Sequence, residues 1–468
     1  MANSGKPLTF LLLPFVVAVW PGRAAAVEDP LPAARPDRVL ESVRQAFSGM
    51  QRFTLRNGLR VVLAPSHLSP TIGISVTYGV GSSAEQVGRS GFAHLFEHLM
   101  FEGSKHAPKG QHFSLIAARG GILNGTTDAD RTNFYEELPA GELALGLWLE
   151  SDRLRYLNVT RPNFENQRAV VEEEFRMSVG SRPYAPAELH LGELVFADYP
   201  PYAHPTIGSL PELEAAKLAW VQDFHQRYYV PENAVLCLTG DFEAEAAKRL
   251  VETYFTTPTP SAARARPAMP EMPKAAEAIR EAVDDPNAAT PALLFGFLIP
   301  PARTRAHYAL ELLTEVLAGA EGSPLRWSLI HDRATALDVS AWCEGHRGPD
   351  QLTLQVVLSD AGAVNDVEAA INAELARMRD RGPRLEELLH AQKKKRAEFL
   401  LGLQTNLGRA IRLGEFESEY GDSRLLADEL KHYLNVTPDD LRSAAQRYLL
   451  PERAVIVQVR PAGRPTSS

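Results

Sequence analysis

Cysteine is scarce in this sequence, which has only Cys237 and Cys343 among its 468 residues. The two are far apart, so a Cys-based zinc site is excluded, and no Gly-rich phosphate loop follows a predicted strand. Cys237 stands in an apolar, strand-like run and is predicted to be a small core residue. Whether the two cysteines are free or form a disulfide stays open, because an exported protein meets an oxidising compartment.

An excess of positive charge is also missing. The formal net charge is -9 at pH 7, whereas a nucleic-acid-binding surface needs clustered Lys and Arg, so we expect no nucleic-acid partner. The one basic run, at residues 393–396, lies in a helical pattern beside acidic residues and is predicted to be a solvated helix face. With 45% hydrophobic and 23% charged residues, the chain has the composition and length of a globular protein with two cores.

Long hydrophobic runs are absent apart from residues 8–20. This segment of about 13 residues is too short for a stable transmembrane helix. It follows Lys6 and precedes an Ala-Ala-Ala sequence at 24–26, a pattern typical of a signal peptide with an Ala-x-Ala cleavage site. We therefore predict a cleavable signal peptide over residues 1–26, a periplasmic or secreted mature protein and no stable membrane span. An uncleaved N-terminal anchor is the alternative.

The strongest chemical signal is the sequence His-Leu-Phe-Glu-His at residues 94–98. In a helix, positions i, i+3 and i+4 lie on one face, so His94, Glu97 and His98 converge. Two such imidazoles can bind one Zn²⁺ and leave the carboxylate beside the metal as a general base, which is the inverzincin arrangement. The alternative is an amphipathic helix with two chance histidines. Burying these polar groups among apolar neighbours is costly unless they are paired or bind a metal.

A third metal ligand has to come from another segment. The charged, helix-like segment 164–177 contains the consecutive residues Glu172, Glu173 and Glu174. Three consecutive residues cannot share one helix face, and periodicity alone does not choose among them. The pattern therefore predicts a ligand helix without naming the ligand.

Together these segments resemble the pitrilysin/insulinase (M16) family of zinc peptidases, in particular its short two-domain members such as mitochondrial processing peptidase. In that family a helix reading Glu-Arg-x-Val-Val-x-x-Glu donates the third ligand from its last Glu. Matching Arg168 and the Val-Val pair that follows implies that the ligand is Glu174. The chain departs from the family at Gln167, where many relatives carry a Glu that supports the site. A neutral amide can hydrogen-bond a ligand but adds no negative charge.

A second resemblance concerns residues 120–135, which read as two extended runs around an Asp-Ala-Asp-Arg turn. In the family, a strand reading Gly-x-x-Asn-Ala-x-Thr borders the cleft and pairs with the substrate backbone, a mode that tolerates varied side chains. Asn124 matches the family's cleft Asn, although Gly125 replaces the usual Ala. An ordinary hairpin with Asn near a turn is the alternative.

A long-range repeat predicts two related domains. Residues 226–235, Gln-Arg-Tyr-Tyr-Val-Pro-Glu-Asn-Ala-Val, recur at 446–455 as Gln-Arg-Tyr-Leu-Leu-Pro-Glu-Arg-Ala-Val. Each copy ends a polar helix, turns at Pro-Glu and enters an apolar strand, and a period this long indicates duplicated domains rather than a solenoid.

The repeat and a Pro/Ala-rich segment between its copies set the predicted boundaries. We expect an N-terminal metal-binding peptidase domain over 45–255, a linker over 256–280 and a homologous C-terminal domain over 281–463. The second domain begins with an apolar strand at 292–299. A helical pattern from His307 follows and contains no His pair, so we expect this domain to be metal-free.

The resemblance implies an α+β fold of two homologous domains, each a mostly antiparallel sheet with helices packed on one face, forming half-shells around a chamber. It implies a zinc-dependent endopeptidase that binds one Zn²⁺ per chain through His94, His98 and Glu174. Glu97 would activate the water that hydrolyses peptides or unfolded polypeptides. Short family members pair two chains, so we expect a dimer with a paralogue that lacks the zinc motif, or a homodimer. The alternatives are a non-catalytic, zinc-retaining structural subunit and a peptide clamp that does not cleave.

Overall fold

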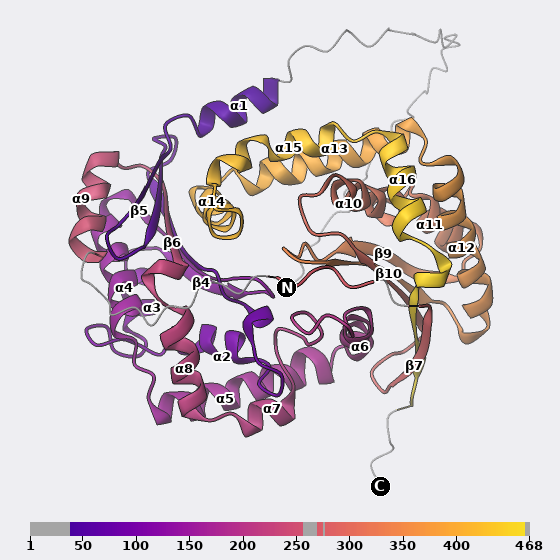
Figure 1. Ribbon diagram of the computed structural model, residues 1–468, viewed down its shortest axis with the longest axis horizontal. Helices are drawn as coiled ribbons and strands as arrows, with labels where there is room; N and C mark the ends of the chain where they lie inside the picture. The colour runs from indigo at the N-terminus through magenta and orange to yellow at the C-terminus, as the bar shows by residue number, and fades with distance from the viewer. Residues whose placement is uncertain (1–37, 256–268, 275–276, 464–468) are drawn as a thin grey trace, which may run out of the picture.

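The computed structural model of the chain describes residues 38–255, 269–274 and 277–463. The predicted signal peptide, 1–26, and much of the predicted linker, 256–280, lie outside these residues. Within them, the strands form a six-stranded and a five-stranded sheet, which lie in opposite lobes of the molecule (Figure 1). No helix in these ranges has the length and apolar character that a membrane span requires.

The first sheet is mostly antiparallel; within it, β2 and β6 run parallel. Its central strands are buried almost throughout, so both faces of the sheet are covered there. In spatial order its strands are β1 (Gln51–Thr54), β2 (Arg60–Pro65), β6 (Ala234–Gly240), β3 (Thr71–Tyr78), β5 (Thr132–Pro139) and β4 (Ile122–Thr127).

The second sheet repeats the order of the last five of these strands and, within the described residues, has no equivalent of β1. Its strands are β7 (Ile279–Asp285), β11 (Val455–Pro461), β8 (Ala292–Ile299), β10 (Asp350–Leu358) and β9 (Ala336–Cys343). Its parallel pair, β7 and β11, matches β2 and β6 in position. The predicted fold class, α+β with mostly antiparallel sheets, and the predicted duplication are therefore confirmed. Strand β7 has no counterpart in the prediction, because its alternating polar residues give no apolar run.

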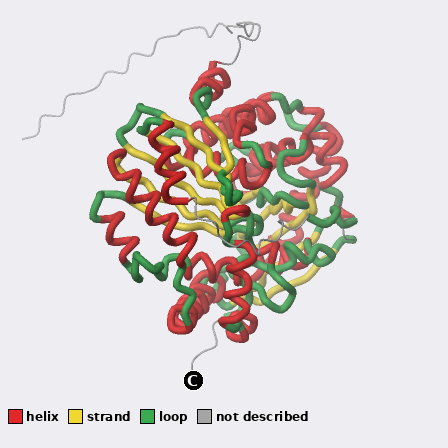
Figure 2. Tube along the Cα trace, turned by 60° about the vertical axis from the view of Figure 1, so that its left-hand side comes forward, coloured by secondary structure: helices red, strands yellow, loops and turns green. Residues whose placement is uncertain are grey.

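The helices of the first half lie mainly on the outer side of the first sheet, and Figure 2 shows the strands side by side behind them. They are α1 (Arg38–Ala46), α2 (Phe92–Leu99), α3 (Gln111–Ala117), α4 (Leu143–Tyr156), α5 (Arg161–Phe175), α6 (Ala185–Val195), α7 (Leu210–Ala215), α8 (Leu218–Tyr228) and α9 (Ala244–Phe255).

The helices of the second half are similarly arranged on the second sheet. They are α10 (Arg305–Ala318), α11 (Pro324–Arg326), α12 (Val364–Arg381), α13 (Leu385–Gly402), α14 (Asn406–Tyr420), α15 (Leu426–Leu434) and α16 (Pro438–Tyr448). The repeated sequence corresponds to the ends of α8 and α16, each followed by a Pro-initiated turn and then by strand β6 or β11.

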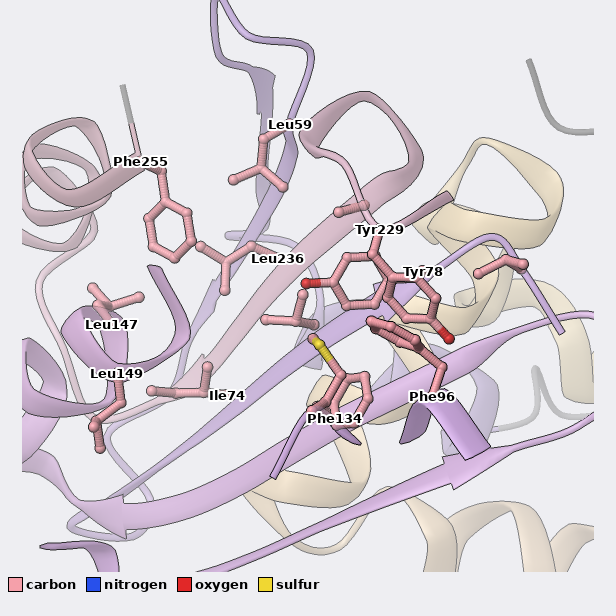
Figure 3. Packing of buried hydrophobic residues seen from close by; sticks show 14 of the residues in the cluster. Leu59, Ile74, Tyr78, Phe96, Phe134, Leu147, Leu149, Tyr229, Leu236 and Phe255 are labelled. Carbon is pink, nitrogen blue, oxygen red and sulfur yellow. The ribbon is translucent and has the colours of Figure 1, made fainter. Parts of the chain in front are cut away.

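The core of the first half contains large aromatic and aliphatic side chains from the sheet and from α2, α4, α8 and α9 (Figure 3). Phe96 of α2 packs against Tyr229, with ring centroids 4.2 Å apart. Tyr78 of β3 packs against both Tyr229 and Phe134. Burial of each such ring stabilises the fold by about 2 kcal/mol or more, so helix α2 is held firmly against the sheet.

Each sheet also carries, on its other face, one helix from the opposite half. Helix α14 packs on β3 and β6, and α6 packs on β8 and β11. A Cβ on Gly414 of α14 would lie 2.8 Å from Oγ1 of Thr77, and one on Gly296 of β8 would lie 2.7 Å from a methyl of Val195. Glycine therefore permits both close approaches. The prediction of helices on one face did not include this exchange, which joins the two halves.

Two smaller predictions can be compared with the structure. Both cysteines are free, and Cys237 is buried in β6 as predicted. The basic run 393–396 is not simply a solvated face. Lys394 lies 2.6 Å from Glu315, and Lys395 lies 3.1 Å from Glu311, because α13 packs against α10. That part of the prediction is wrong, and helix packing is the physical reason.

Candidate metal and catalytic site

Helices α2 and α5 bring three potential metal ligands together. His94 and His98 project from α2 and Glu174 from the last turn of α5, with one donor atom of each within 4.8 Å of the other two. Nε2 of His98 lies 3.2 Å from one Glu174 oxygen, and Nε2 of His94 lies 3.7 Å from the other. The side chain of Glu174 is 43% exposed, so this group of donors opens to solvent.

The local sequence explains why α2 begins where it does. Gly91 precedes the helix with φ +86°, a conformation that favours glycine. The carboxylate of Glu85 accepts hydrogen bonds from the backbone N–H groups of Gly91 and Ala93, at 2.9 and 2.6 Å. These bonds satisfy donors that have no partner within the helix. Helix α5 is capped by Thr160, whose hydroxyl accepts from the N–H of Asn163.

The electrostatics of His94 suit metal binding. Burial, and to a lesser extent the charge of His98, lowers the pKa of His94 to about 4. His94 is therefore neutral near pH 7, and a metal ligand must be the neutral imidazole. Two imidazole nitrogens and a carboxylate form a donor set typical of zinc in hydrolytic enzymes. The residues present therefore fit the ion that the sequence predicts.

Glu97 lies on the same face of α2 and is fixed by the neighbouring edge strand. Oγ1 of Thr127 in β4 donates a hydrogen bond of 2.6 Å to Oε2 of Glu97. A Cβ on Gly125 would lie 3.1 Å from Cγ of Glu97, so the glycine lets the strand pass close to this carboxylate. Burial raises the pKa of Glu97, and the Thr127 hydrogen bond opposes part of that shift.

Asn124 lies on the same strand but points to solvent. Its side chain is exposed, and its Oδ1 accepts from the N–H of Gly125 at 2.9 Å. Strand β4 is an edge of the first sheet, so one side of it can accept a further strand. The predicted hairpin is confirmed, since β4 and β5 pair around residues 128–131.

The other two glutamates of the run 172–174 pair with arginines instead of the histidines. Glu172 pairs with Arg168 and Arg176 at 3.5 and 3.7 Å, and Glu173 pairs with Arg176 at 3.2 Å. Gln167 contacts the site from behind, with its Oε1 3.3 Å from Nδ1 of His98. The structure thus brings His94, His98, Glu97, Glu174 and Gln167 together and leaves Asn124 on the bordering strand.

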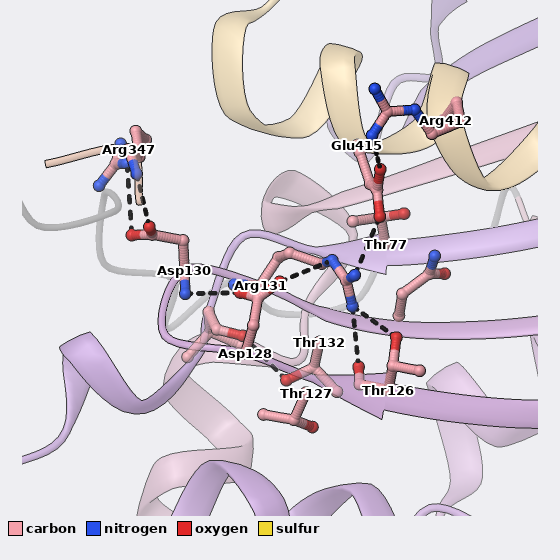
Figure 4. A network of polar contacts seen from close by, with 12 residues as sticks. Thr77, Thr126, Thr127, Asp128, Asp130, Arg131, Thr132, Arg347, Arg412 and Glu415 are labelled. Carbon is pink, nitrogen blue, oxygen red and sulfur yellow. Dashed lines mark hydrogen bonds and ion pairs between the residues drawn. The ribbon is translucent and has the colours of Figure 1, made fainter. Parts of the chain in front are cut away.

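The second half of the chain holds the tip of this hairpin (Figure 4). Arg131 lies between Asp128, at 3.1 Å, and Glu415 of α14, at 2.9 Å. The carboxylate of Asp130 accepts from the backbone N–H of Arg347 at 2.9 Å and from the hydroxyl of Tyr202. The strand that carries Thr127 is therefore anchored by residues far away in the sequence.

Sequence reasoning missed Thr127 and Glu102, which contacts Gln167. A signal for Thr127 was available, because alternate residues of a strand share a face and Thr127 stands two positions after Gly125. No signal pointed to Glu102, whose contact depends on the packing of α5 against α2.

Two family profiles match the chain. Residues 60–194 match the profile described as "Insulinase (Peptidase family M16)", and residues 217–395 match "Peptidase M16 inactive domain". The chain belongs to the M16 peptidase family. It has the two-domain architecture in which an insulinase-type domain precedes an inactive domain.

This M16 member is similar over most of its length to proteins of known name or structure. It is 26% identical over 416 residues to "Zinc protease PqqE" of Helicobacter pylori, covering 87% of this chain and 92% of that one. A crystal structure of a protease from Helicobacter pylori superposes with a TM-score of 0.83 at 23% identity, covering 88% and 99% of the two chains. The periplasmic protease PqqL from Escherichia coli superposes with a TM-score of 0.71 at 18% identity, covering 88% of this chain and 48% of that one.

Proposed function

We propose that this M16 family member is a zinc-dependent endopeptidase that binds one Zn²⁺ through His94, His98 and Glu174. The observation that carries the proposal is the convergence of two imidazoles and a carboxylate within 4.8 Å, with a second carboxylate held on the same helix face. Family membership supports the peptidase class, and relatives bear the name zinc protease.

The chemistry follows from what each group can do. Zinc bound by these ligands would polarise the peptide carbonyl and increase the acidity of a water molecule. Glu97 takes a proton from the attacking water, whose oxygen bonds to the carbonyl carbon, and passes the proton to the leaving nitrogen as the C–N bond breaks. The hydroxyl of Thr127 donates to Oε2 of Glu97 and so fixes the orientation of this carboxylate.

Replacement of Glu97 by Gln tests this mechanism. The amide has the same shape but cannot take the proton, so the variant should keep about one zinc per chain and lose nearly all peptidase activity on a fluorogenic peptide. A matched control is Glu165→Gln, an exposed position on α5, which should behave as wild type. Wild-type cleavage by Glu97→Gln would disprove the mechanism. Binding of peptide without chelator-sensitive cleavage by the wild type would favour the clamp or the structural subunit.

We also propose that substrates are peptides or unfolded polypeptides. The exposed edge of β4, with Asn124, can pair with an extended backbone, and such pairing demands little of side chains. A folded protein does not offer a free strand and could not enter a chamber between half-shells. A disordered polypeptide should therefore be degraded while a stable globular protein of similar composition survives, as judged by electrophoresis of both in one reaction.

A dimer would complete the chamber. We propose that the chain pairs with a paralogue that lacks the zinc motif, or with a second copy of itself. Activity of the purified chain should then be weak and should rise when the paralogue is added. Full activity from a strictly monomeric species, measured by light scattering at the assay concentration, would contradict this.

For localisation we propose the periplasm or secretion, on the basis of the signal-peptide pattern in residues 1–26. The similar protein PqqL is named a periplasmic protease. Fractionation followed by N-terminal sequencing of the mature chain tests the proposal, and a start near residue 27 is expected.

A further inference from the structure

A chain of polar contacts through three side chains, those of Gln167, Glu102 and Lys109, begins at Nδ1 of His98. Nδ1 of His98 lies 3.3 Å from Oε1 of Gln167, and Nε2 of Gln167 donates a bond of 2.7 Å to Oε1 of Glu102. The other oxygen of Glu102 lies 2.5 Å from Nζ of Lys109. Glu102 is only 6% exposed, whereas the side chain of Lys109 is 56% exposed. A buried carboxylate thus stands one amide away from a proposed metal ligand.

The direction of each hydrogen bond follows from chemistry. Nε2 of His98 faces Glu174 at 3.2 Å, on the side of the proposed metal. With zinc bound at Nε2, the proton of the neutral imidazole would be carried by Nδ1. That N–H requires an acceptor, which is the amide oxygen of Gln167, and the amide NH₂ requires another acceptor, which is the carboxylate of Glu102. If the amide of Gln167 were flipped, its NH₂ would face the N–H of His98 and its oxygen would face the carboxylate of Glu102. The direction of both hydrogen bonds is therefore fixed.

Local backbone geometry brings the members of this chain together. Glu102 lies just after the end of α2, and Gly103 follows it with φ +96°. A Cβ at position 103 would lie 2.5 Å from the backbone N of Lys109, so only glycine lets the loop return this closely. Gln167 projects from α5, the helix that also carries Glu174.

The second proposed histidine ligand has no such support. Nδ1 of His94 is buried and has no hydrogen-bond partner among the described residues. Of the two imidazoles, His98 is therefore the one whose orientation a hydrogen bond at Nδ1 can fix. Contacts of this kind fix the tautomer and ring orientation of a ligand, and their loss typically lowers metal affinity about 10- to 100-fold.

We propose that Gln167 and Glu102 act as one positioning unit for His98, in which the buried carboxylate of Glu102 supplies, through the amide, the negative charge that Gln167 itself lacks. The inference rests on the proposed zinc site. It assigns Glu102 as a positioning residue rather than a catalytic one, because it contacts neither the ligand atoms nor Glu97. It also explains how a neutral amide can stand at position 167, where the resemblance implies a Glu.

Exchange of the two side chains tests the proposal. Glu102→Gln keeps the shape and the hydrogen bond but removes the charge, so zinc affinity should fall about tenfold. Gln167→Glu sets a second carboxylate against Glu102 at hydrogen-bond distance, and the repulsion should weaken zinc binding as well. The double variant Glu102→Gln/Gln167→Glu moves the charge by one position, and its affinity should return to within about threefold of wild type.

The readout is the dissociation constant for Zn²⁺, measured by competition with a chromophoric chelator, together with the melting temperature of each apo protein. Glu165→Gln, exposed on the same helix, is the matched control and should not change either value. If wild type binds no zinc, the proposed function fails and this inference fails with it. If wild type binds zinc but Glu102→Gln binds it equally well, only the positioning unit is wrong. A double variant as weak as Glu102→Gln would show that Glu102 serves merely as a partner of Lys109, and would also overturn the inference.

Discussion

Helix α2 of the first half and helix α10 of the second half occupy matching places in the duplicated fold. Each follows the equivalent strand of its sheet, β3 or β8, and each packs against the corresponding pair of helices, α5 and α8 or α13 and α16. Each carries a histidine as its third residue, His94 in α2 and His307 in α10. The polar groups around the two histidines differ.

His307 is held between two carboxylates. Its Nε2 lies 2.7 Å from Asp350, and its Nδ1 lies 3.4 Å from Glu311. Burial by itself would lower the pKa of His307, but the hydrogen bonds and charges of Asp350 and Glu311 outweigh burial and raise it to about 9. His94, by contrast, has its pKa lowered to about 4 and faces another imidazole. One scaffold thus holds a neutral, ligand-type histidine in one half and a protonated one in the other.

The charge of the second group is balanced by the protein itself. Lys395 of α13 lies 3.1 Å from Glu311 of α10. In the first half the corresponding helix, α5, instead places Glu174 beside His98. His307, Glu311, Lys395 and Tyr433 line a polar cavity of about 500 Å³. In the second half two protein cations, the imidazolium of His307 and the ammonium of Lys395, thus balance the carboxylates, whereas in the first half a metal ion would do so.

The distances between potential ligand atoms do not by themselves distinguish the first half from the second as a metal site. His307, Cys343 and Asp350 also bring donor atoms within 4.8 Å of one another. Burial, followed by the charges of Asp350 and Glu311, raises the pKa of the Cys343 thiol well above its usual value, so the thiolate that a metal needs is disfavoured. The expectation that the second half is metal-free stays a prediction, and a physical argument now supports it.

The most direct test of this difference between the two halves is to replace one histidine in each. His94→Ala should abolish tight zinc binding and reduce peptidase activity by about three orders of magnitude or more, because several kcal/mol of transition-state stabilisation depend on the metal. His307→Ala should retain about one zinc per chain and most of the activity. Metal analysis after gel filtration and a peptide assay on both variants would decide. Zinc retained by His94→Ala but lost by His307→Ala would reverse the assignment.

The second expected effect is on stability. His307→Ala removes the cation shared by the buried Asp350 and the half-buried Glu311, and breaking a buried ion pair in this way costs about 3–5 kcal/mol. Urea unfolding followed by fluorescence measures the loss. His331→Ala, at an exposed position with a side-chain exposure of 44%, is the control and should change the free energy of unfolding little. Equal stability of the two variants would mean that the network around His307 contributes nothing.

A third test concerns Glu97, whose counterpart three residues after His307 is the fully buried Leu310. Thr127→Val keeps the shape of the side chain but removes the hydrogen bond of 2.6 Å to Glu97. We expect kcat to fall about tenfold with zinc content unchanged, because a mispositioned base transfers protons less well. Thr253→Val, at an exposed position of α9 where the hydroxyl bonds to the carbonyl of Arg249 in the same helix, is the control. Similar activity of both variants would show that the hairpin does not orient Glu97.

The smallest expected effect is a pH dependence of stability in the second half. In the unfolded chain His307 loses its proton near pH 6.5, whereas in the fold it keeps the proton up to about pH 9. Its contribution is therefore fully present below about pH 6.5 and is lost as the pH rises through 9. The gap in melting temperature between wild type and His307→Asn should be largest at pH 6 and should narrow towards pH 9.5. A gap that stays constant over this range would contradict the protonated state.

Much of the fold could be predicted from local patterns. The strand at 292–299 is an uninterrupted apolar run, and the structure has β8 as Ala292–Ile299 with every residue buried. The repeat correctly indicated that β6 and β11 follow equivalent helices. Strand β7 and the exchange of α6 and α14 could not be predicted, because their positions depend on contacts with residues far away in the sequence.

The sequence by itself determined that His94, Glu97 and His98 share one helix face, because the period of the α-helix settles that within five residues. It left three glutamates open on α5, and resemblance favoured Glu174. Only the packing of α5 against α2 brings Glu174 within 3.2 Å of His98, and only that packing sets Gln167 and Glu102 behind the same ring. Tertiary structure likewise decided the surroundings of His307, since Asp350 contacts it from strand β10 and Lys395 of α13 pairs with its neighbour Glu311. The physical reason is that charges separated by many residues interact only where the fold makes them neighbours.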